Sequence, residues 1–262
     1  ATLFLGMITL PYALPAQEVD APVRYDEDYL SADFHRSRRA AVVAQLPGNS
    51  LVVLFGAPMR NRSNDMDYEY RQASDFLYLT GSEEPGSALI LAPGGLEVDG
   101  ERVHEILFVP PRDPAREVWD GRRFGAERAM QRLGVELALD AMRFAEILVP
   151  LLQNAQHRVY HLGFPDGVPE RSVLYDQLAA FMDNVDPAAL AGAGTGSAAP
   201  LRGVLDGLRA IKSDEEMTAL RRAIDITTEA HREVMQQVQA GWAEYEIEAL
   251  VEYTFKRNGS EQ

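Results

Sequence analysis

Leu51-Val52-Val53-Leu54-Phe55 is an unbroken apolar run that follows the turn residues Pro47-Gly48. A run of this length, rich in β-branched and aromatic residues, is typical of a buried β-strand. Turn residues separate it from further apolar runs of strand length. We expect strands at each of these runs: Phe76–Leu79, Ala88–Leu91 and Glu105–Val109, with turns at Glu84-Pro85-Gly86, Pro93-Gly94-Gly95 and Pro110-Pro111.

Segments with helical spacing of apolar residues lie before and after these strands. Asp33–Leu46 reads as a helix with arginines on its outer face. Further helices are predicted at Gly125–Leu133, Phe144–Asn154 and Val173–Met182, and a further strand at Arg158–Leu162. Because strands and helices alternate irregularly, the pattern predicts an α/β domain over residues 31–190, with helices packed on a sheet.

Ala191–Pro200, with the sequence Ala-Gly-Ala-Gly-Thr-Gly-Ser-Ala-Ala-Pro, marks a change in composition. Its glycines resemble a phosphate-binding loop, but Ser197 stands where the third glycine would be required and no strand precedes it. We therefore interpret residues 191–204 as a flexible linker between two domains.

Ser213-Asp214-Glu215-Glu216 carries the signature of a capping box, which begins a helix. Apolar residues at helical spacing follow it, and a second amphipathic segment runs from Ile247 to Gly259 after a break at Gly241. We expect residues 205–262 to be the start of a second domain. Two amphipathic helices alone would leave apolar faces uncovered.

The amino-terminal apolar run Leu3–Leu10 is followed by a stretch of small residues and prolines. This pattern is typical of a clipped secretory signal, and it favours an exported protein with residues 1–30 as signal remnant and mobile tail. The run is too short to cross a membrane as a helix. The alternative is a buried strand in a cytoplasmic protein.

Composition excludes several classes of protein. The formal net charge of −15 argues against a nucleic-acid or anionic-membrane partner. The chain has no cysteine, which excludes disulfides and thiolate metal sites. An apolar content of 46% is ordinary for a globular protein that buries a core.

Candidates for metal or catalytic chemistry are sparse in the sequence itself. His157 and His161 are four residues apart, but a strand would separate them by about 13 Å, too far to share a zinc ion. We expect both to be solvated or locally hydrogen-bonded. Two polar segments, Asn61–Asp75 and Glu117–Arg123, are dense in functional groups and are candidate binding loops.

These polar segments carry a resemblance to a known family. Arg62-Ser63-Asn64-Asp65 and Tyr70-Arg71-Gln72-Ala73-Ser74-Asp75-Phe76-Leu77-Tyr78-Leu79-Thr80-Gly81 resemble the N-terminal domain of aminopeptidase P, the Xaa-Pro aminopeptidases. Glu117-Val118-Trp119-Asp120-Gly121-Arg122-Arg123 is similar to a second family motif, and residues 209–223 resemble the entry to the family's catalytic domain.

The resemblance implies a creatinase-like mixed α/β domain followed by an incomplete pita-bread (α+β) domain. It implies a metal-dependent hydrolase that removes the residue before proline from peptides, using two divalent metals, commonly manganese. All five metal ligands of the family would lie beyond Gln262. We therefore expect no catalytic and no metal-binding residue in this chain, and an inactive fragment. We expect carboxylates in first turns of helices to stabilise the helix dipole instead, as at Asp214, Glu215, Glu244 and Glu246.

The resemblance also implies a homo-oligomer in which Asp65 and Trp119 approach a neighbouring active site and contact the peptide substrate. On residues alone, a turn-forming Asp65 and a buried Trp119 are competing interpretations. Two other functions stay open: a stand-alone, non-catalytic binding or oligomerisation module, and an Xaa-Pro dipeptidase (prolidase), which shares the architecture.

Overall fold

The computed structural model describes residues 30–115, 117–121, 123–154, 156–170, 172–185 and 198–260. The strands of these ranges are β1 (Ser50–Phe55), β2 (Asn61–Ser63), β3 (Met66–Asp67), β4 (Ala88–Val98), β5 (Glu101–Val109), β6 (Leu137–Asp140) and β7 (Arg158–Tyr160). The helices are α1 (Ala32–Ala44), α2 (Ser74–Thr80), α3 (Glu117–Asp120), α4 (Gly125–Leu133), η2 (Ala141–Arg143), α5 (Phe144–Gln153), α6 (Val173–Asn184), α8 (Ala198–Ala210), α9 (Asp214–Gln237) and α10 (Glu244–Arg257). The predicted signal remnant and tail, apart from Leu30, lie outside the described residues.

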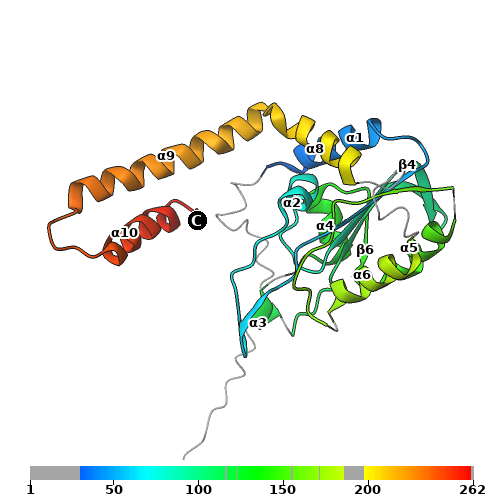
Figure 1. Cartoon of the computed structure of the whole chain (residues 1–262), viewed down its shortest axis with the longest axis horizontal. Coiled ribbons are helices and arrows are strands. Elements are labelled where there is room, and N and C mark those ends of the chain that lie inside the picture. Colours follow the sequence, from blue (N-terminus) through cyan, green and yellow to red (C-terminus); the bar gives the residue numbers. More distant parts are fainter. Residues whose placement is uncertain are drawn as a thin grey trace, which may run out of the picture.

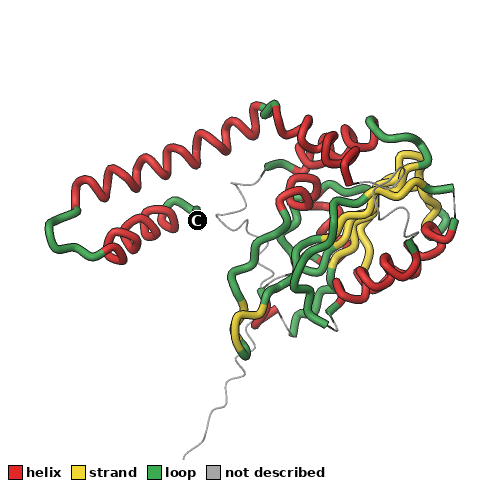
Figure 2. The backbone as a smooth tube through the Cα atoms, viewed as in Figure 1, coloured by secondary structure: helices red, strands yellow, loops and turns green. Residues whose placement is uncertain are grey.

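A mixed five-stranded sheet forms the centre of the domain, with the strand order β6-β5-β4-β1-β7 (Figures 1 and 2). β4 runs antiparallel to its neighbours β1 and β5, whereas β6 is parallel to β5 and β7 is parallel to β1. β1 is buried along its whole length, as its continuous apolar run predicts. The predicted mixed α/β fold is confirmed.

Alternating side chains of the strands pack against different layers of helices. Val52 and Leu54 of β1 face a cluster completed by residues of α1, α2, α4 and α8, whereas Leu51 and Val53 face a cluster completed by α5 and α6. Successive side chains of a strand point to opposite faces, so this alternation gives a sheet covered on both sides. The domain therefore has three layers, as Figure 1 shows.

A fully buried arginine ties three of these elements together. Arg39 of α1 is 0% exposed, and its Nε and Nη2 donate to the two carboxylate oxygens of Glu105 at 2.7 and 2.9 Å. Its Nη1 donates to the carbonyl of Leu79 at 2.8 Å, and Nη2 also donates to that of Gly134 at 2.8 Å. The buried charge is thus paired and hydrogen-bonded, as burial of an ion requires.

The predicted strand Phe76–Leu79 is wrong, because residues 74–80 form helix α2. A four-residue apolar run is ambiguous between strand and buried helix. Gly81, with φ of 70°, ends the helix in the left-handed conformation, and Gly81 N–H donates to the Leu77 carbonyl. The predicted turn at 93–95 is also wrong. β4 continues through it, with a register shift between Leu91 and Leu96.

The predicted linker 191–204 needs correction in its second half, because residues 198–204 belong to α8. Leu201 and Leu205 are one helical turn apart and both 0% exposed, in the core cluster shared with α1 and α2. Their burial stabilises a helix despite Gly203 and Gly207. A boundary at 205 would divide this helix. Residues 191–197 lie outside the described part of the chain.

The capping box at Ser213 is confirmed. Ser213 Oγ accepts from the Glu216 N–H at 3.3 Å, and Glu216 Oε2 accepts from the Ser213 N–H at 2.8 Å. α9 ends at Gln237, earlier than the predicted end at Gly241. It extends away from the sheet, and α10 folds back beside it (Figure 1). No helix in the described ranges is long and apolar enough to cross a bilayer.

Candidate functional site

Asp65 lies in the turn of a short hairpin formed by β2 and β3. Asn61 organises this turn, because its Nδ2 donates to the carbonyls of Asn64 and Met66 at 3.0 and 3.1 Å. Asp65 is exposed, and so is the neighbouring Met66, at 60%. The structure therefore presents the Asp65 carboxylate to solvent at the tip of a hairpin.

Trp119 lies on the short helix α3 and is 87% exposed, beside Val118 at 82%. The interpretation of Trp119 as a buried aromatic is therefore wrong. Glu117 holds the start of α3, because its Oε1 accepts from Arg112 Nε at 2.8 Å and from the Arg123 N–H at 3.3 Å. The structure therefore presents two adjacent large apolar side chains on the outside of a braced helix.

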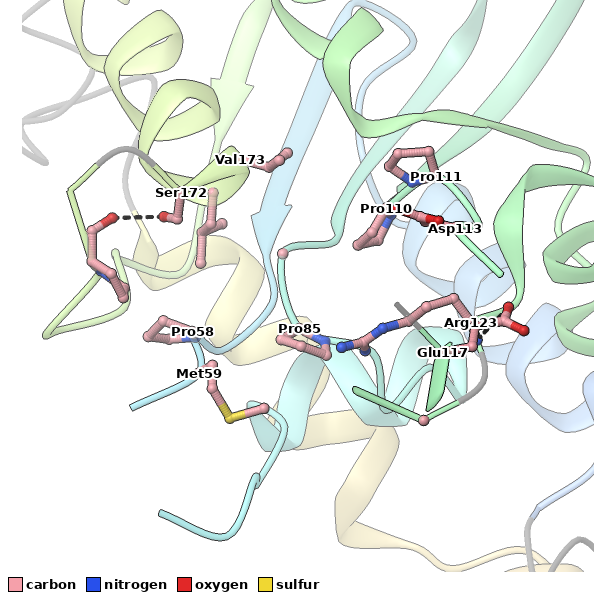
Figure 3. A pocket seen from close by; sticks show the side chains of 14 residues that line it. Pro58, Met59, Pro85, Pro110, Pro111, Asp113, Glu117, Arg123, Ser172 and Val173 are labelled. Carbon is pink, nitrogen blue, oxygen red and sulfur yellow. Dashed lines mark hydrogen bonds between the residues drawn. The ribbon is translucent and has the colours of Figure 1, made fainter. Parts of the chain in front are cut away.

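One cavity of about 440 Å³ borders the loop Glu117–Arg123 and the residues that directly precede the segment Asn61–Asp75. Pro58 and Met59, which lead into the hairpin of Asp65, line one part of it, and Glu117 and Arg123, which flank Trp119, line another (Figure 3). The structure thus brings the two candidate loops to one region, although they are separated by two strands of the sheet in sequence.

Two titratable groups, the buried Glu84 and the half-buried Tyr70, lie close to Arg123. Glu84 is 6% exposed, and desolvation by burial raises the pKa of its carboxyl. Burial also raises the pKa of the Tyr70 hydroxyl, which donates to the Ala57 carbonyl at 3.2 Å. The Arg123 charge opposes both shifts. In both groups, burial therefore favours the neutral form.

Several residues of the motif at 70–81 hold the domain together. Gln72 is buried, accepts from the Ala57 N–H at 2.6 Å and donates to the carbonyls of Ser82 and Glu84 at 3.1 Å each. It fixes the loop after β1 to the loop before β4. The sequence does not mark this role, because the burial of Gln72 is visible only in the structure.

Asp75 and Tyr78 of the same motif bind α8. Asp75 Oδ2 pairs with Arg202 at 2.5 Å, and Oδ1 pairs with Arg209 at 2.7 Å. The Tyr78 hydroxyl donates to the Leu208 carbonyl at 3.2 Å, and the Arg209 guanidinium lies 5.3 Å from the Tyr78 ring centroid. The sequence does not predict this role, because the first part of α8 has the composition of a linker.

His157 and His161 do not form a metal pair. Strand β7 separates them, and His161 is buried, stacked on Phe164 with ring centroids 5.0 Å apart. Its Nδ1 accepts from the Gly163 N–H at 3.2 Å, which is the local hydrogen bond expected. Burial lowers the pKa of His161.

The residues that the structure describes do not fit a metal centre, because no group of three or more His, Asp or Glu side chains among them could hold an ion. Instead, Glu215 accepts from Ser31 Oγ at 3.0 Å, and Glu216 accepts from Arg38 at 3.0 Å. Glu246 accepts from the Ala243 N–H at the start of α10. These three carboxylates therefore form hydrogen bonds at helix ends and between helices.

Residues 35–160 match the family model of the aminopeptidase P N-terminal domain. The chain is 35% identical over 232 residues to the Xaa-Pro aminopeptidase of Escherichia coli, covering 87% of this chain and 49% of that protein. It is 36% identical over 227 residues to the Xaa-Pro aminopeptidase of Haemophilus influenzae, covering 84% and 46%. The chain thus spans about half the length of these curated relatives.

Solved structures give the same relationship. E. coli aminopeptidase P with the inhibitor Pro-Leu superposes with a TM-score of 0.70 at 32% identity, over 89% of this chain and 51% of that one. A zinc-substituted form of the same enzyme in complex with product matches with a TM-score of 0.71 at 32% identity. The matched region extends beyond residue 160, so the likeness includes residues outside the matched domain.

Proposed function

Because residues 35–160 form an aminopeptidase P N-terminal domain, we propose that the chain is the N-terminal part of an Xaa-Pro aminopeptidase. Such an enzyme removes the N-terminal residue that precedes proline in a peptide. The observation that carries the proposal is the 35% identity to the E. coli Xaa-Pro aminopeptidase over 87% of this chain. In this proposal, residues from α9 onward begin the pita-bread metallopeptidase domain.

The metal chemistry belongs, in this proposal, to residues of the longer enzyme that follow Gln262. Two divalent ions, manganese by the family resemblance, would activate the attacking water and clamp the scissile bond. The described residues do not fit such a site. Manganese titration of this chain by calorimetry, with an Xaa-Pro peptide assay alongside, tests the assignment. Tight stoichiometric binding or metal-dependent turnover would overturn it.

Asp65 and Trp119 are proposed to contact the peptide substrate from a neighbouring subunit of a homo-oligomer. Their exposure supports this role, because a side chain that is 87% exposed is available to a second molecule. Trp119 would offer its indole face to an apolar group, such as a proline ring, and Asp65 would offer its carboxylate to a free amine. Export through a secretory signal is a further part of the proposal.

The experiment uses the enzyme that contains this chain, with Trp119→Ala and Asp65→Asn as variants. We expect weaker turnover of Xaa-Pro peptides longer than a dipeptide, with melting temperature and metal content near those of the wild type. Met142→Ala is the matched control, since Met142 is an exposed apolar residue, at 77%, from a different part of the domain. Equal effects of Trp119→Ala and Met142→Ala would argue against a role in substrate binding.

Substrate length separates the aminopeptidase from the alternative of a prolidase. A prolidase would turn over Xaa-Pro dipeptides and reject longer peptides. A stand-alone module would turn over neither, and it would require that the protein in the cell lack the downstream ligands.

A further inference from the structure

The cavity of about 440 Å³ lies beyond one edge of the central sheet. Pro58 follows the end of β1, Pro110 follows the end of β5, and Pro85 precedes β4, which runs between them in the opposite direction. In α/β sheets, ligands bind outside the carboxyl ends of strands where the neighbouring connections diverge. Here the carboxyl ends of β1 and β5 border the cavity, whereas β4 between them contributes its amino end.

Five prolines line the cavity: Pro58, Pro85, Pro110, Pro111 and Pro169. A proline has a fixed φ and no N–H, so these walls are stiff and apolar and offer no backbone donors from the prolines themselves. Met59, Val173 and Leu174 add further apolar surface. A ligand of this cavity therefore needs an apolar body and must obtain its hydrogen bonds from side chains.

Arg123 supplies such donors. Its side chain reaches into the cavity toward Pro85, as Figure 3 shows. Its backbone N–H is fixed by Glu117, and the Glu117 carboxylate is itself paired with Arg112 at 2.8 Å. Within the described ranges, no side chain lies at hydrogen-bond or ion-pair distance from the Arg123 guanidinium. The donors of this cation are therefore available to a ligand.

Glu84 is one nearby acid that could cancel this charge. It precedes the cavity wall at Pro85, is 6% exposed and accepts from the Phe124 N–H. Its Oε2 is buried and has no hydrogen-bond partner among the described residues. Burial raises the pKa of Glu84, which favours the uncharged acid. Glu84 therefore does not fully compensate the positive charge of Arg123.

We propose that this cavity binds a small aliphatic monocarboxylate, such as the free carboxyl end of a peptide with an apolar last residue, and that Arg123 holds the carboxylate. A guanidinium binds a carboxylate through two parallel N–H···O bonds, while the proline walls cover the aliphatic part. Asp113 also lines the cavity and disfavours a ligand with a second negative charge. The proposal does not depend on the peptidase activity.

The test uses N-acetyl-leucine and its uncharged analogue N-acetyl-leucinamide as probes, titrated into the protein and followed by NMR. We expect the acid to shift the backbone amide signals of Gly86 and Gly121, which line the cavity. Because the amide lacks the carboxylate, we expect it to bind roughly tenfold more weakly or not at all.

Arg123→Met keeps the aliphatic stem, removes the charge and should weaken binding of the acid roughly tenfold or more. Arg102→Met is the control, since Arg102 is an exposed arginine that pairs with Glu97 away from the cavity. If Arg123→Met does not fold, Val173→Phe tests the proposal by filling the cavity, and it should abolish binding. Equal binding of acid and amide, unchanged binding by Arg123→Met, or no binding of the acid at all would each overturn the proposal.

Discussion

Replacing Asp75 by Asn tests whether α8 is fastened to the N-terminal domain by charge. The change keeps the shape of the side chain but removes the anion that pairs with Arg202 and Arg209. The two arginine side chains are 44% and 42% exposed, so each pair is screened and contributes about 0.5–1 kcal/mol. Asp75 also lies in the first turn of α2, where a carboxylate contributes about 0.3–1 kcal/mol. The sum predicts a loss of about 1.3–3 kcal/mol in the free energy of unfolding.

Asp33→Asn is the matched control. Asp33 is likewise a first-turn carboxylate that pairs with an arginine, but that pair lies within α1 and its two side chains are 58% and 85% exposed. We expect the control to lose only about 0.5 kcal/mol. Urea denaturation measures both variants, and amide hydrogen exchange locates the effect. Faster exchange in α8 is the expected result for Asp75→Asn. Equal losses in the two variants, or unchanged exchange in α8, would refute the reasoning.

The remaining predictions concern a cap, a surface aromatic, a buried ion pair and a buried acid. Ser213→Ala should cost about 0.5–2 kcal/mol in denaturant melting, and no change would show that the cap is redundant. Trp119→Ala should leave the free energy of unfolding within about 0.5 kcal/mol of wild type, because the side chain packs against little. Arg39→Met should cost about 3–5 kcal/mol, because it leaves Glu105 without its buried partner, and Arg39→Met with Glu105→Met should recover part of this loss in the same assay. Glu84 has a raised pKa in the folded state, so wild-type stability should fall as pH rises from the unfolded pKa of 4.5 toward the folded pKa. Glu84→Gln should remove that fall, and parallel urea midpoints for the two proteins across this pH range would contradict the assignment.

Periodicity and turn residues were sufficient to predict much of the fold. β1 and α4 lie where the apolar pattern puts them, and the cap at Ser213 has the predicted hydrogen bonds. These elements depend on local chemistry, which a sequence displays directly. The helix at 74–80 was missed because its short apolar run has no visible period and because it is held by packing against α1 and by the bonds of Asp75 and Tyr78 to α8. Such contacts between distant segments have no local signature.

The same distinction applies to the candidate site. The exposure of Asp65 and Trp119 follows from the polar loops that carry them. That Pro58, which precedes the first loop, and Glu117 of the second loop line one cavity depends on strand order, because the pairing of β1, β4 and β5 brings these residues together. The bonds of Gln72 to loops 57 and 82–84 depend on that pairing too. The residue types were sufficient to predict these positions as candidates, but they could not show which of them lie close together in the folded protein.

A small change in the contacts at the start of α9 would give a large displacement at the far end of this helix. Glu216 completes the cap of the helix and also binds Arg38 of α1, and Glu215 binds Ser31, so two adjacent carboxylates hold the first turn of the helix to the domain. A helix of 24 residues is about 36 Å long. A tilt of about 10° at the cap would therefore displace the far end by about 6 Å, more than one helical turn. The carboxylates of Glu215 and Glu216 therefore help to determine the direction of α9 and the position of α10, which follows it.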